Sequence, residues 1–207
     1  MSDRYDSSQS PEGQYQPGSN DKVLLNKLGI TDSVDMDEVE LGLLDQLAVA
    51  LLDEIEVDQH IYAKDLCEWH RRWLGNVFTW AGQYRSVNMA KEEFQFAAAH
   101  LIPQLMQKFE TDFLDKYTPC EGMSDQQLSE ALANVHLEFI LIHPFREGNG
   151  RLGRLLATIM ALQAGRPPLD FTCLTDNKEK YIQAIHAGLD NIEPMKTLFE
   201  QVLRQSD

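Results

Sequence analysis

One stretch of twelve residues reads His143-Pro144-Phe145-Arg146-Glu147-Gly148-Asn149-Gly150-Arg151-Leu152-Gly153-Arg154 and lies between two apolar stretches of helical period. Gly148 and Gly150 permit backbone conformations in which successive N–H groups form a concave site for an anion. Because the apolar pattern resumes at Leu152, a helix follows this turn directly, and the N-terminus of a helix favours bound phosphate. The stretch therefore predicts a helix–loop–helix whose loop binds phosphate groups.

The charged and titratable side chains of this stretch suit phosphate chemistry. Arg151 and Arg154 share one face of the second helix, and guanidinium groups pair well with phosphate oxygens. Glu147 lies beside the predicted anion site, where a carboxylate usually holds a cation such as Mg²⁺. His143 closes the first helix, and an imidazole can accept a proton near neutral pH. Each feature alone also fits an ordinary turn or a solvated helix face, but their combination favours an enzyme that acts on phosphates.

This stretch resembles the Fic motif, His-Pro-Phe-x-(Asp/Glu)-Gly-Asn-Gly-Arg-x-x-Arg, and matches it at every defined position. Residues 17–30 resemble the usual opening of small Fic proteins, and residues 78–88 resemble the segment that enters the family's flap. The resemblance extends over residues 14–204. It implies an all-α fold, a Fic-type helical bundle with a small β-hairpin flap.

The resemblance also implies a protein adenylyltransferase, a nucleotidyltransferase that moves AMP from ATP to a Ser, Thr or Tyr hydroxyl of a target protein and releases pyrophosphate. ATP would be the co-substrate, with Mg²⁺ or Mn²⁺ as the cofactor. By position in the motif, His143 would be the general base and Glu147 would hold the metal ion. Arg151 would support the loop, Arg154 would reach the β- or γ-phosphate, and Phe145 would anchor the loop in the core. The phosphates of ATP would be bound by Gly148, Asn149, Gly150, Arg151 and Arg154.

Two alternatives to AMP transfer from ATP stay open. Gly150 stands where a kinase-like branch, the Doc toxins, carries Lys, so the resemblance favours AMP transfer over transfer of the γ-phosphate. The motif handles phosphates without selecting a base, so transfer of another nucleotide monophosphate or phosphate-containing group is the first alternative. The second is a non-catalytic nucleotide-binding module, against which the intact His143, Glu147 and Arg154 argue.

Residues 82–96 interrupt the helical pattern. Side chains alternate over residues 85–89 and again over 94–96, with charged residues between them, which predicts a β-hairpin. In Fic proteins this hairpin is the flap, which positions a target segment by strand-like main-chain pairing. The resemblance implies docking of the target protein at Val87, Asn88, Met89, Ala90 and Lys91.

The chain divides into a polar start and a helical body. Residues 1–20 contain no Leu, Ile, Val or Phe, and a segment with so little apolar surface predicts a disordered N-terminal tail. A short helix is expected near Asp21–Leu28, and apolar side chains recur with helical period from Leu41 onward. We therefore expect residues 21–207 to form a single Fic domain, with the motif loop at residues 143–154.

Composition limits the classes of function. With 207 residues, of which 43% are hydrophobic, the chain can bury one core. A formal net charge of -15 argues against a nucleic-acid-binding protein, because such proteins need a basic surface. The three scattered cysteines fit free thiols in a reducing compartment. No apolar run reaches membrane-spanning length and no signal peptide is recognisable, so we expect a cytoplasmic protein without a membrane partner.

The family resemblance also implies how the protein is regulated. Many Fic proteins are silenced by the pattern (Ser/Thr)-x-x-x-Glu-(Gly/Asn), whose Glu pairs with the second motif arginine, here Arg154. Residues 8–13 match these letters with Glu12, but Pro11 fits only a first helical turn and the surrounding tail has no apolar face. The resemblance therefore favours a toxin or regulator held by a separate antitoxin that supplies the inhibitory Glu. Constitutive activity or another inhibitory segment is the alternative.

Overall fold

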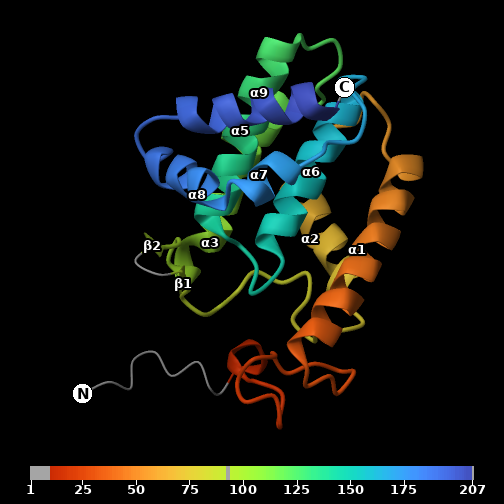
Figure 1. The fold of residues 1–207 in the computed structure, drawn as a ribbon, viewed down its shortest axis with the longest axis vertical. Coiled ribbons are helices and arrows are strands. Elements are labelled where there is room, and N and C mark those ends of the chain that lie inside the picture. Colours follow the sequence, from red (N-terminus) through yellow and green to blue (C-terminus); the bar gives the residue numbers. More distant parts are fainter. Residues whose placement is uncertain (1–9, 92–93, 207) are drawn as a thin grey trace.

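The computed structural model describes residues 10–91 and 94–206 of the chain, and helices form most of it (Figure 1). The predicted all-α architecture with one small hairpin is confirmed. A π-helical segment over Glu110–Leu114 joins α3 to α4, and 3₁₀ turns lie at Pro11–Gly13 and Ala99–Leu101. The α-helices are α1 (Ser33–Glu54), α2 (Ala63–Leu74), α3 (Ile102–Phe109), α4 (Asp115–Tyr117), α5 (Asp125–Ile142), α6 (Asn149–Gln163), α7 (Thr172–Asp176), α8 (Lys178–Ala187) and α9 (Glu193–Ser206).

Helix α5 is the centre of the core. It begins at a capping box, in which the Ser124 hydroxyl accepts from the Gln127 amide and the Gln127 side chain accepts from the Ser124 amide. It packs against α6 and α9, and α1 packs on α2 and α6 (Figure 1). Burying each of its large apolar side chains contributes about 1.5–3 kcal/mol. Those side chains include Leu128, Leu132, Val135, Phe139 and Ile142.

The motif loop begins where α5 ends. His143 takes a left-handed conformation with φ of 53°, and Pro144 disfavours helical geometry in the residue before it. Gly148 has φ of 81° and directly precedes α6. A Cβ at Gly148 would lie 2.6 Å from the Trp73 ring, so only glycine fits this position without strain.

The predicted hairpin is present, with short strands. β1 (Ala90–Lys91) pairs with β2 (Phe94–Gln95) in the antiparallel sense, and Ala90 lies opposite Gln95. We call residues 82–96 the flap. Most of the flap therefore depends on contacts outside the strands for its position.

Residues 10–20, part of the predicted disordered tail, have a defined structure, so that part of the prediction is wrong. A 3₁₀ turn at Pro11–Gly13 leads into a bridge between Tyr15 and Leu24. Main-chain hydrogen bonds of 2.8 and 2.9 Å to residues 23–25 compensate for the apolar surface that the segment lacks. Residues 21–28 form no helix, so that prediction is also wrong. Val23 and Leu25 instead bond through their main chains to Gln16 and Gln14. The remainder of the predicted tail, residues 1–9, lies outside the described residues.

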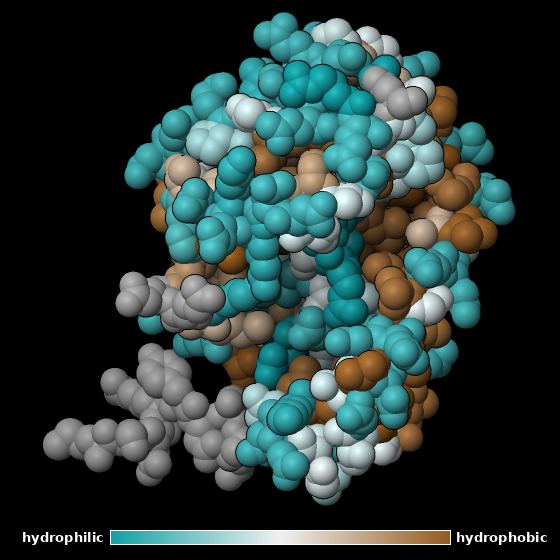
Figure 2. All heavy atoms as spheres, in the orientation of Figure 1, coloured by the Kyte–Doolittle hydropathy of each residue, from teal (hydrophilic) through white to brown (hydrophobic). Residues whose placement is uncertain are grey.

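Helix α1 carries apolar side chains on two faces. Its inner face buries Leu47 and Leu51. Its outer face exposes Val34, Leu41, Val49 and Leu52. Figure 2 shows hydrophilic side chains over most of the visible surface, with hydrophobic ones gathered on the side where α1 lies. Among the helices of residues 10–91 and 94–206, none combines the length and the apolar character needed to cross a membrane.

Candidate active site

The turn of the motif loop is closed by reciprocal hydrogen bonds between Phe145 and Asn149. The buried Asn149 side chain accepts from the Phe145 amide at 2.9 Å and donates to the Phe145 carbonyl at 2.7 Å. The Phe145 ring is fully buried and stacks on His70, with ring centroids 4.1 Å apart. Phe145 is thus the core anchor that we expected. The Asn149 side chain shapes the loop, and its main chain begins α6, where N–H groups have no partner within the helix.

His70 on α2 supports the loop from behind, a role that we did not predict. Its Nδ1 accepts from the Gly82 amide at 2.8 Å, so its Nε2 carries the proton and donates to the Glu147 carbonyl at 3.1 Å. Burial lowers the pKa of His70 to about 4, so the ring is neutral at physiological pH. Its place in an apolar helical stripe with Trp69 and Trp73 is the one sequence signal of this buried role.

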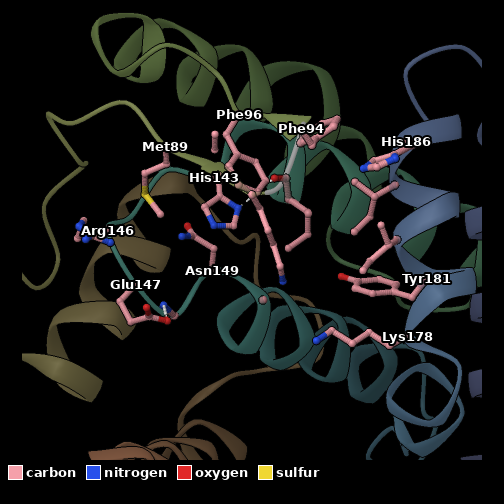
Figure 3. Close-up of a pocket in the computed structure, with 17 residues that line it drawn as sticks. Met89, Phe94, Phe96, His143, Arg146, Glu147, Asn149, Lys178, Tyr181 and His186 are labelled. Carbon is pink, nitrogen blue, oxygen red and sulfur yellow. Dashed lines mark hydrogen bonds between the residues drawn. The ribbon is translucent and has the colours of Figure 1, made fainter. Parts of the chain in front are cut away.

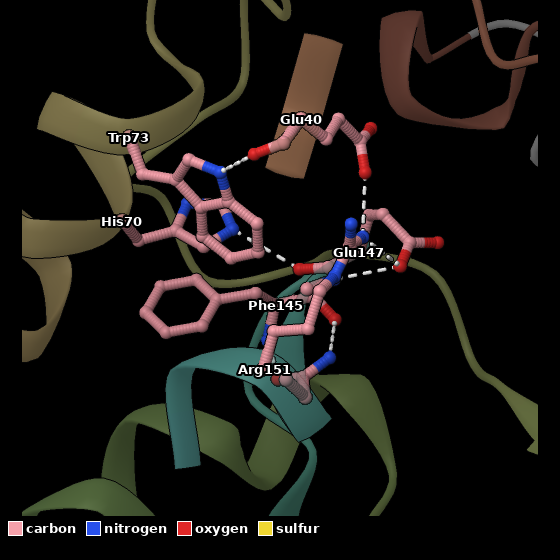
Figure 4. A network of polar contacts seen from close by, with 8 residues as sticks. Glu40, His70, Trp73, Phe145, Glu147 and Arg151 are labelled. Atoms are coloured by element: carbon pink, nitrogen blue, oxygen red, sulfur yellow. Dashed lines mark hydrogen bonds and ion pairs between the residues drawn. The ribbon is translucent and has the colours of Figure 1, made fainter. Parts of the chain in front are cut away.

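Arg151 joins the loop to α1 and α2 (Figure 4). Its guanidinium lies 2.5 Å from the Glu40 carboxylate and 3.3 Å from that of Glu147, and it packs over the Trp73 ring. Burial raises the pKa of Glu40, and the charge of Arg151 opposes this shift. Trp73 completes the group by donating to the Glu40 carbonyl at 2.7 Å. Arg151 does not line the cavity between the motif loop, the flap and α8, so its expected part in phosphate binding stays a prediction.

A cavity of about 370 Å³ lies between the motif loop, the flap and α8 (Figure 3). This volume is within the range of small-molecule sites. Its side chains include three cations, Lys91, Arg146 and Lys178, in a chain with a net charge of -15. The cavity therefore favours an anionic ligand. The predicted catalytic, metal-binding and phosphate-binding residues that line it are His143, Glu147, Gly148, Asn149 and Gly150.

His143 faces the cavity as a neutral imidazole. Its Nδ1 lies 3.2 Å from the Ile140 carbonyl, which can only accept, so Nδ1 carries the proton and Nε2 keeps its lone pair. The ring stacks on Phe96 of the flap, with ring centroids 3.8 Å apart. Burial lowers the pKa of His143 to about 4, and the charges of Arg85 and Lys91 add to this effect. At physiological pH Nε2 can therefore accept a proton.

Arg154 lies close to Tyr181 and is partly buried, and burial lowers its pKa. Among the described residues no carboxylate pairs with it. Tyr181 lines the cavity, and its hydroxyl lies 2.8 Å from Nε2 of the buried His136. Arg154 itself does not line the cavity, so its expected contact with a phosphate stays a prediction.

The predicted flap residues divide into two groups. Val87 and Asn88 hold the flap in place, since the Val87 carbonyl accepts from Arg85 at 2.6 Å and the Asn88 side chain accepts from the Ala99 amide at 2.9 Å. Their docking of a target, like that of the other three, stays a prediction. The residues that line the cavity are Met89, Ala90 and Lys91.

Arg85, a second residue without a predicted role, links the flap to His143. Its guanidinium donates to the carbonyls of His143 at 2.7 Å and of Val87 and Ala97 at 2.6 Å. Its amide donates to the Pro144 carbonyl at 2.9 Å, and the side chain is only 2% exposed. This buried cation therefore holds the flap at Val87, and the residue that follows the flap, Ala97, relative to the motif loop.

A metal ion at this site would depend on Glu147. The Glu147 carboxylate accepts from the Gly148 amide at 2.8 Å and stays 43% exposed beside the cavity. Within the part of the chain that the structure describes, no group of three or more His, Cys, Asp or Glu side chains could hold a metal ion. One carboxylate together with phosphate oxygens and water is a donor set that fits Mg²⁺.

Several known proteins are similar to this chain in sequence. Protein adenylyltransferase fic-1 of Caenorhabditis briggsae is 30% identical over 144 residues, which are 68% of this chain and 26% of that protein. A probable protein adenylyltransferase Fic of Salmonella typhimurium is 29% identical over 171 residues, 80% of this chain and 78% of that protein. The chain therefore spans about a quarter of the nematode relative and most of the bacterial one.

A solved structure and a family model agree with these relatives. BepC, a VirB-translocated effector protein of Bartonella tribocorum solved with bound AMPPNP, superposes with a TM-score of 0.73 at 25% identity. The match covers 94% of this chain and 97% of the BepC chain. The model of the Fic/DOC family matches residues 60–161, which include α2, the flap and the whole motif loop. The chain belongs to the Fic/DOC family.

Proposed function

We propose that this protein is an adenylyltransferase that moves AMP from ATP to a hydroxyl of a target protein. The observation that carries the proposal is the neutral His143, whose free Nε2 faces a cationic cavity at the start of α6. The relatives named protein adenylyltransferases support the reaction type. The AMPPNP complex of BepC supports a nucleoside triphosphate as the donor.

In this mechanism the target hydroxyl loses its proton as its oxygen attacks the α-phosphorus. Nε2 of His143 accepts the proton while the new O–P bond forms, and the bond to the bridging oxygen breaks to release pyrophosphate. N–H groups at the start of α6 stabilise the charge on the phosphate oxygens. Lys91 and Lys178 add positive charge on the cavity walls.

Two further residues have proposed parts in binding the donor. Glu147 would hold Mg²⁺ or Mn²⁺ against the phosphates, since its carboxylate is exposed beside the cavity. The bound ion would neutralise charge on the departing pyrophosphate. Arg154 would reach the β- or γ-phosphate, which would supply the anion that this cation lacks among the described residues.

Labelled ATP tests the proposal. The purified protein is incubated with cell lysate, Mg²⁺ and ATP that carries the label at either the α- or the γ-phosphate. AMP transfer predicts protein-bound label from α-labelled ATP alone, and chelation of Mg²⁺ by EDTA should remove it. Label from γ-labelled ATP alone would instead establish a kinase. Competition by unlabelled GTP or UTP that exceeds that of ATP would identify a different donor.

We also infer that any inhibitory Glu comes from a second protein, as an antitoxin restrains a toxin. The candidate within this chain, Glu12, bonds to Ser86 and makes no ion pair with Arg154. This inference predicts that the purified chain transfers AMP without removal of its N-terminal residues. Activity that appears only after such a truncation would contradict it.

A further inference from the structure

Glu12 is a buried carboxylate that contacts the flap. It is 7% exposed, and its Oε1 accepts from the Ser86 amide at 2.8 Å and from the Ser86 hydroxyl. Burying a carboxylate is costly unless hydrogen bonds replace its water. The two bonds to Ser86 therefore hold Glu12 at the residue that follows Arg85.

The main chain of Glu12 contacts the motif loop. Arg146 donates from Nε to the Glu12 carbonyl at 2.8 Å. Arg146 lies between His143 and Glu147 in the sequence and lines the cavity. The 3₁₀ turn at Pro11–Gly13 thus bonds to both the flap and the motif loop.

Arg85 continues this connection to His143. Its guanidinium donates to the main-chain carbonyls of Val87 in the flap, of Ala97 directly after the flap, and of His143. Burial lowers the pKa of Arg85, and the negative charge of Glu12 acts in the opposite direction. Glu12 therefore both bonds to the neighbouring Ser86 and helps to neutralise Arg85.

We propose that Glu12 is a positioning residue that holds the flap and the motif loop in one arrangement, so that a hydroxyl docked on the flap meets Nε2 of His143. This inference rests on the proposed function and deepens it. In this role Glu12 supports AMP transfer, whereas an inhibitory Glu suppresses it. Replacing an inhibitory Glu would raise AMP transfer, whereas replacing a positioning Glu lowers it.

The rates of AMP transfer by Glu12→Ala and Glu12→Gln show whether Glu12 supports or inhibits transfer. Glu38→Gln is the matched control, because it removes the same charge from an exposed position on α1. Misplacement by about 1 Å can cost about 100-fold in rate, so we expect Glu12→Ala to lower transfer at saturating ATP by about 10-fold or more. Glu12→Gln keeps an acceptor for Ser86 and should retain more activity than Glu12→Ala. The control should match wild type.

Binding of AMPPNP separates positioning from general damage. Glu12 does not line the cavity, so the affinity for AMPPNP should stay within about twofold of wild type while the transfer rate falls. Transfer that is unchanged or raised in Glu12→Ala would overturn the inference. So would a parallel loss of AMPPNP binding and transfer, which indicates partial unfolding. If Glu12→Ala does not fold, Ser86→Ala replaces it. We then expect a smaller fall in the transfer rate, again with unchanged affinity for AMPPNP.

Hydrogen exchange tests the inference even if the wild-type protein transfers no AMP. The amides of Phe96 and Ala97 bond to the carbonyls of Met89 and Leu141 and report on the flap away from Glu12. Glu12→Ala should accelerate exchange at Phe96 and Ala97, and Glu38→Gln should not. Unchanged exchange would overturn the positioning role. Absence of AMP transfer by wild type would by itself refute only the proposed function.

Discussion

The two sides of the motif loop differ in how their charges are paired. Behind the loop, Arg151 pairs with Glu40 and His70 donates to the Glu147 carbonyl. In front of it, Arg146, Lys91 and Lys178 line a cavity without an ion pair to any described carboxylate. Protein groups therefore pair the charges behind the loop, whereas the cations in front of it can bind an anionic ligand. Substitutions behind the loop should therefore change stability first, and substitutions in front should change binding.

Removing the rear carboxylate gives the largest expected effect. Glu40→Ala leaves Arg151 without its closest partner and should cost about 3 kcal/mol in the free energy of unfolding. Urea denaturation followed by circular dichroism measures the change. The exposed Glu38→Ala on the same helix is the control, and equal stability of the two variants would show that the rear pair does not hold the loop.

A substitution that crowds the contact between the motif loop and α2 should have the second largest effect on stability. Gly148→Ala places a Cβ 2.6 Å from the Trp73 ring at a backbone φ of 81°, which should cost about 2 kcal/mol. Gly150→Ala is the control for thermal melting, because a Cβ at Gly150 meets no atom within 4 Å. Similar melting temperatures for both variants would contradict the close contact between the loop and α2.

A front substitution should separate binding from stability. Lys178→Ala removes an exposed cation from the cavity and should weaken AMPPNP binding by about fivefold, or about 1 kcal/mol, with an unchanged melting temperature. Isothermal titration calorimetry measures the affinity. Lys180→Ala, also exposed on α8 but outside the cavity, is the matched control. A loss of stability without a loss of affinity would remove the distinction between the two sides.

The smallest effect concerns pH. Burial lowers the pKa of His70, His136 and His143 to about 4 from an ordinary value of 6.5, so the unfolded chain binds more protons between these values. Stability should therefore decrease as pH falls from 6.5 toward 4, with less than about 1 kcal/mol lost per histidine between pH 7 and pH 6. Melting temperatures across this range should depend less steeply on pH in His136→Gln. An equally steep dependence would show that His136 is not buried as a neutral ring.

The parts of the site that neighbouring residues build were predictable from the sequence. The end of α5 before Pro144, the glycine at 148 and the start of α6 follow from local backbone rules. The left-handed conformation of His143 does not follow from them, because a residue before proline favours extended geometry. The alternation in residues 82–96 predicted the hairpin, although only two residues of each strand pair. The fold class followed from helical periodicity and from the family resemblance.

The long-range contacts were not predictable. Glu12 meets Ser86 across 74 positions and Arg146 across 134, and no local pattern marks such a partner. Glu40 meets Arg151 across 111 positions. Because α1 carries apolar residues on both faces, the periodicity of its sequence could not show which of its carboxylates is buried. Residues 10–20 were predicted to be disordered for a related reason, since hydrogen bonds rather than apolar side chains fix them.

One measurement tests the central claim, that the front of the loop carries a base for AMP transfer. Transfer from α-labelled ATP and binding of AMPPNP are compared for wild type, His143→Ala and the exposed-histidine control His100→Ala. General bases contribute about 10²–10⁴-fold, so His143→Ala should lose at least about 100-fold in transfer while it still binds AMPPNP. His100→Ala should behave as wild type. Transfer by His143→Ala at the wild-type rate would contradict the account.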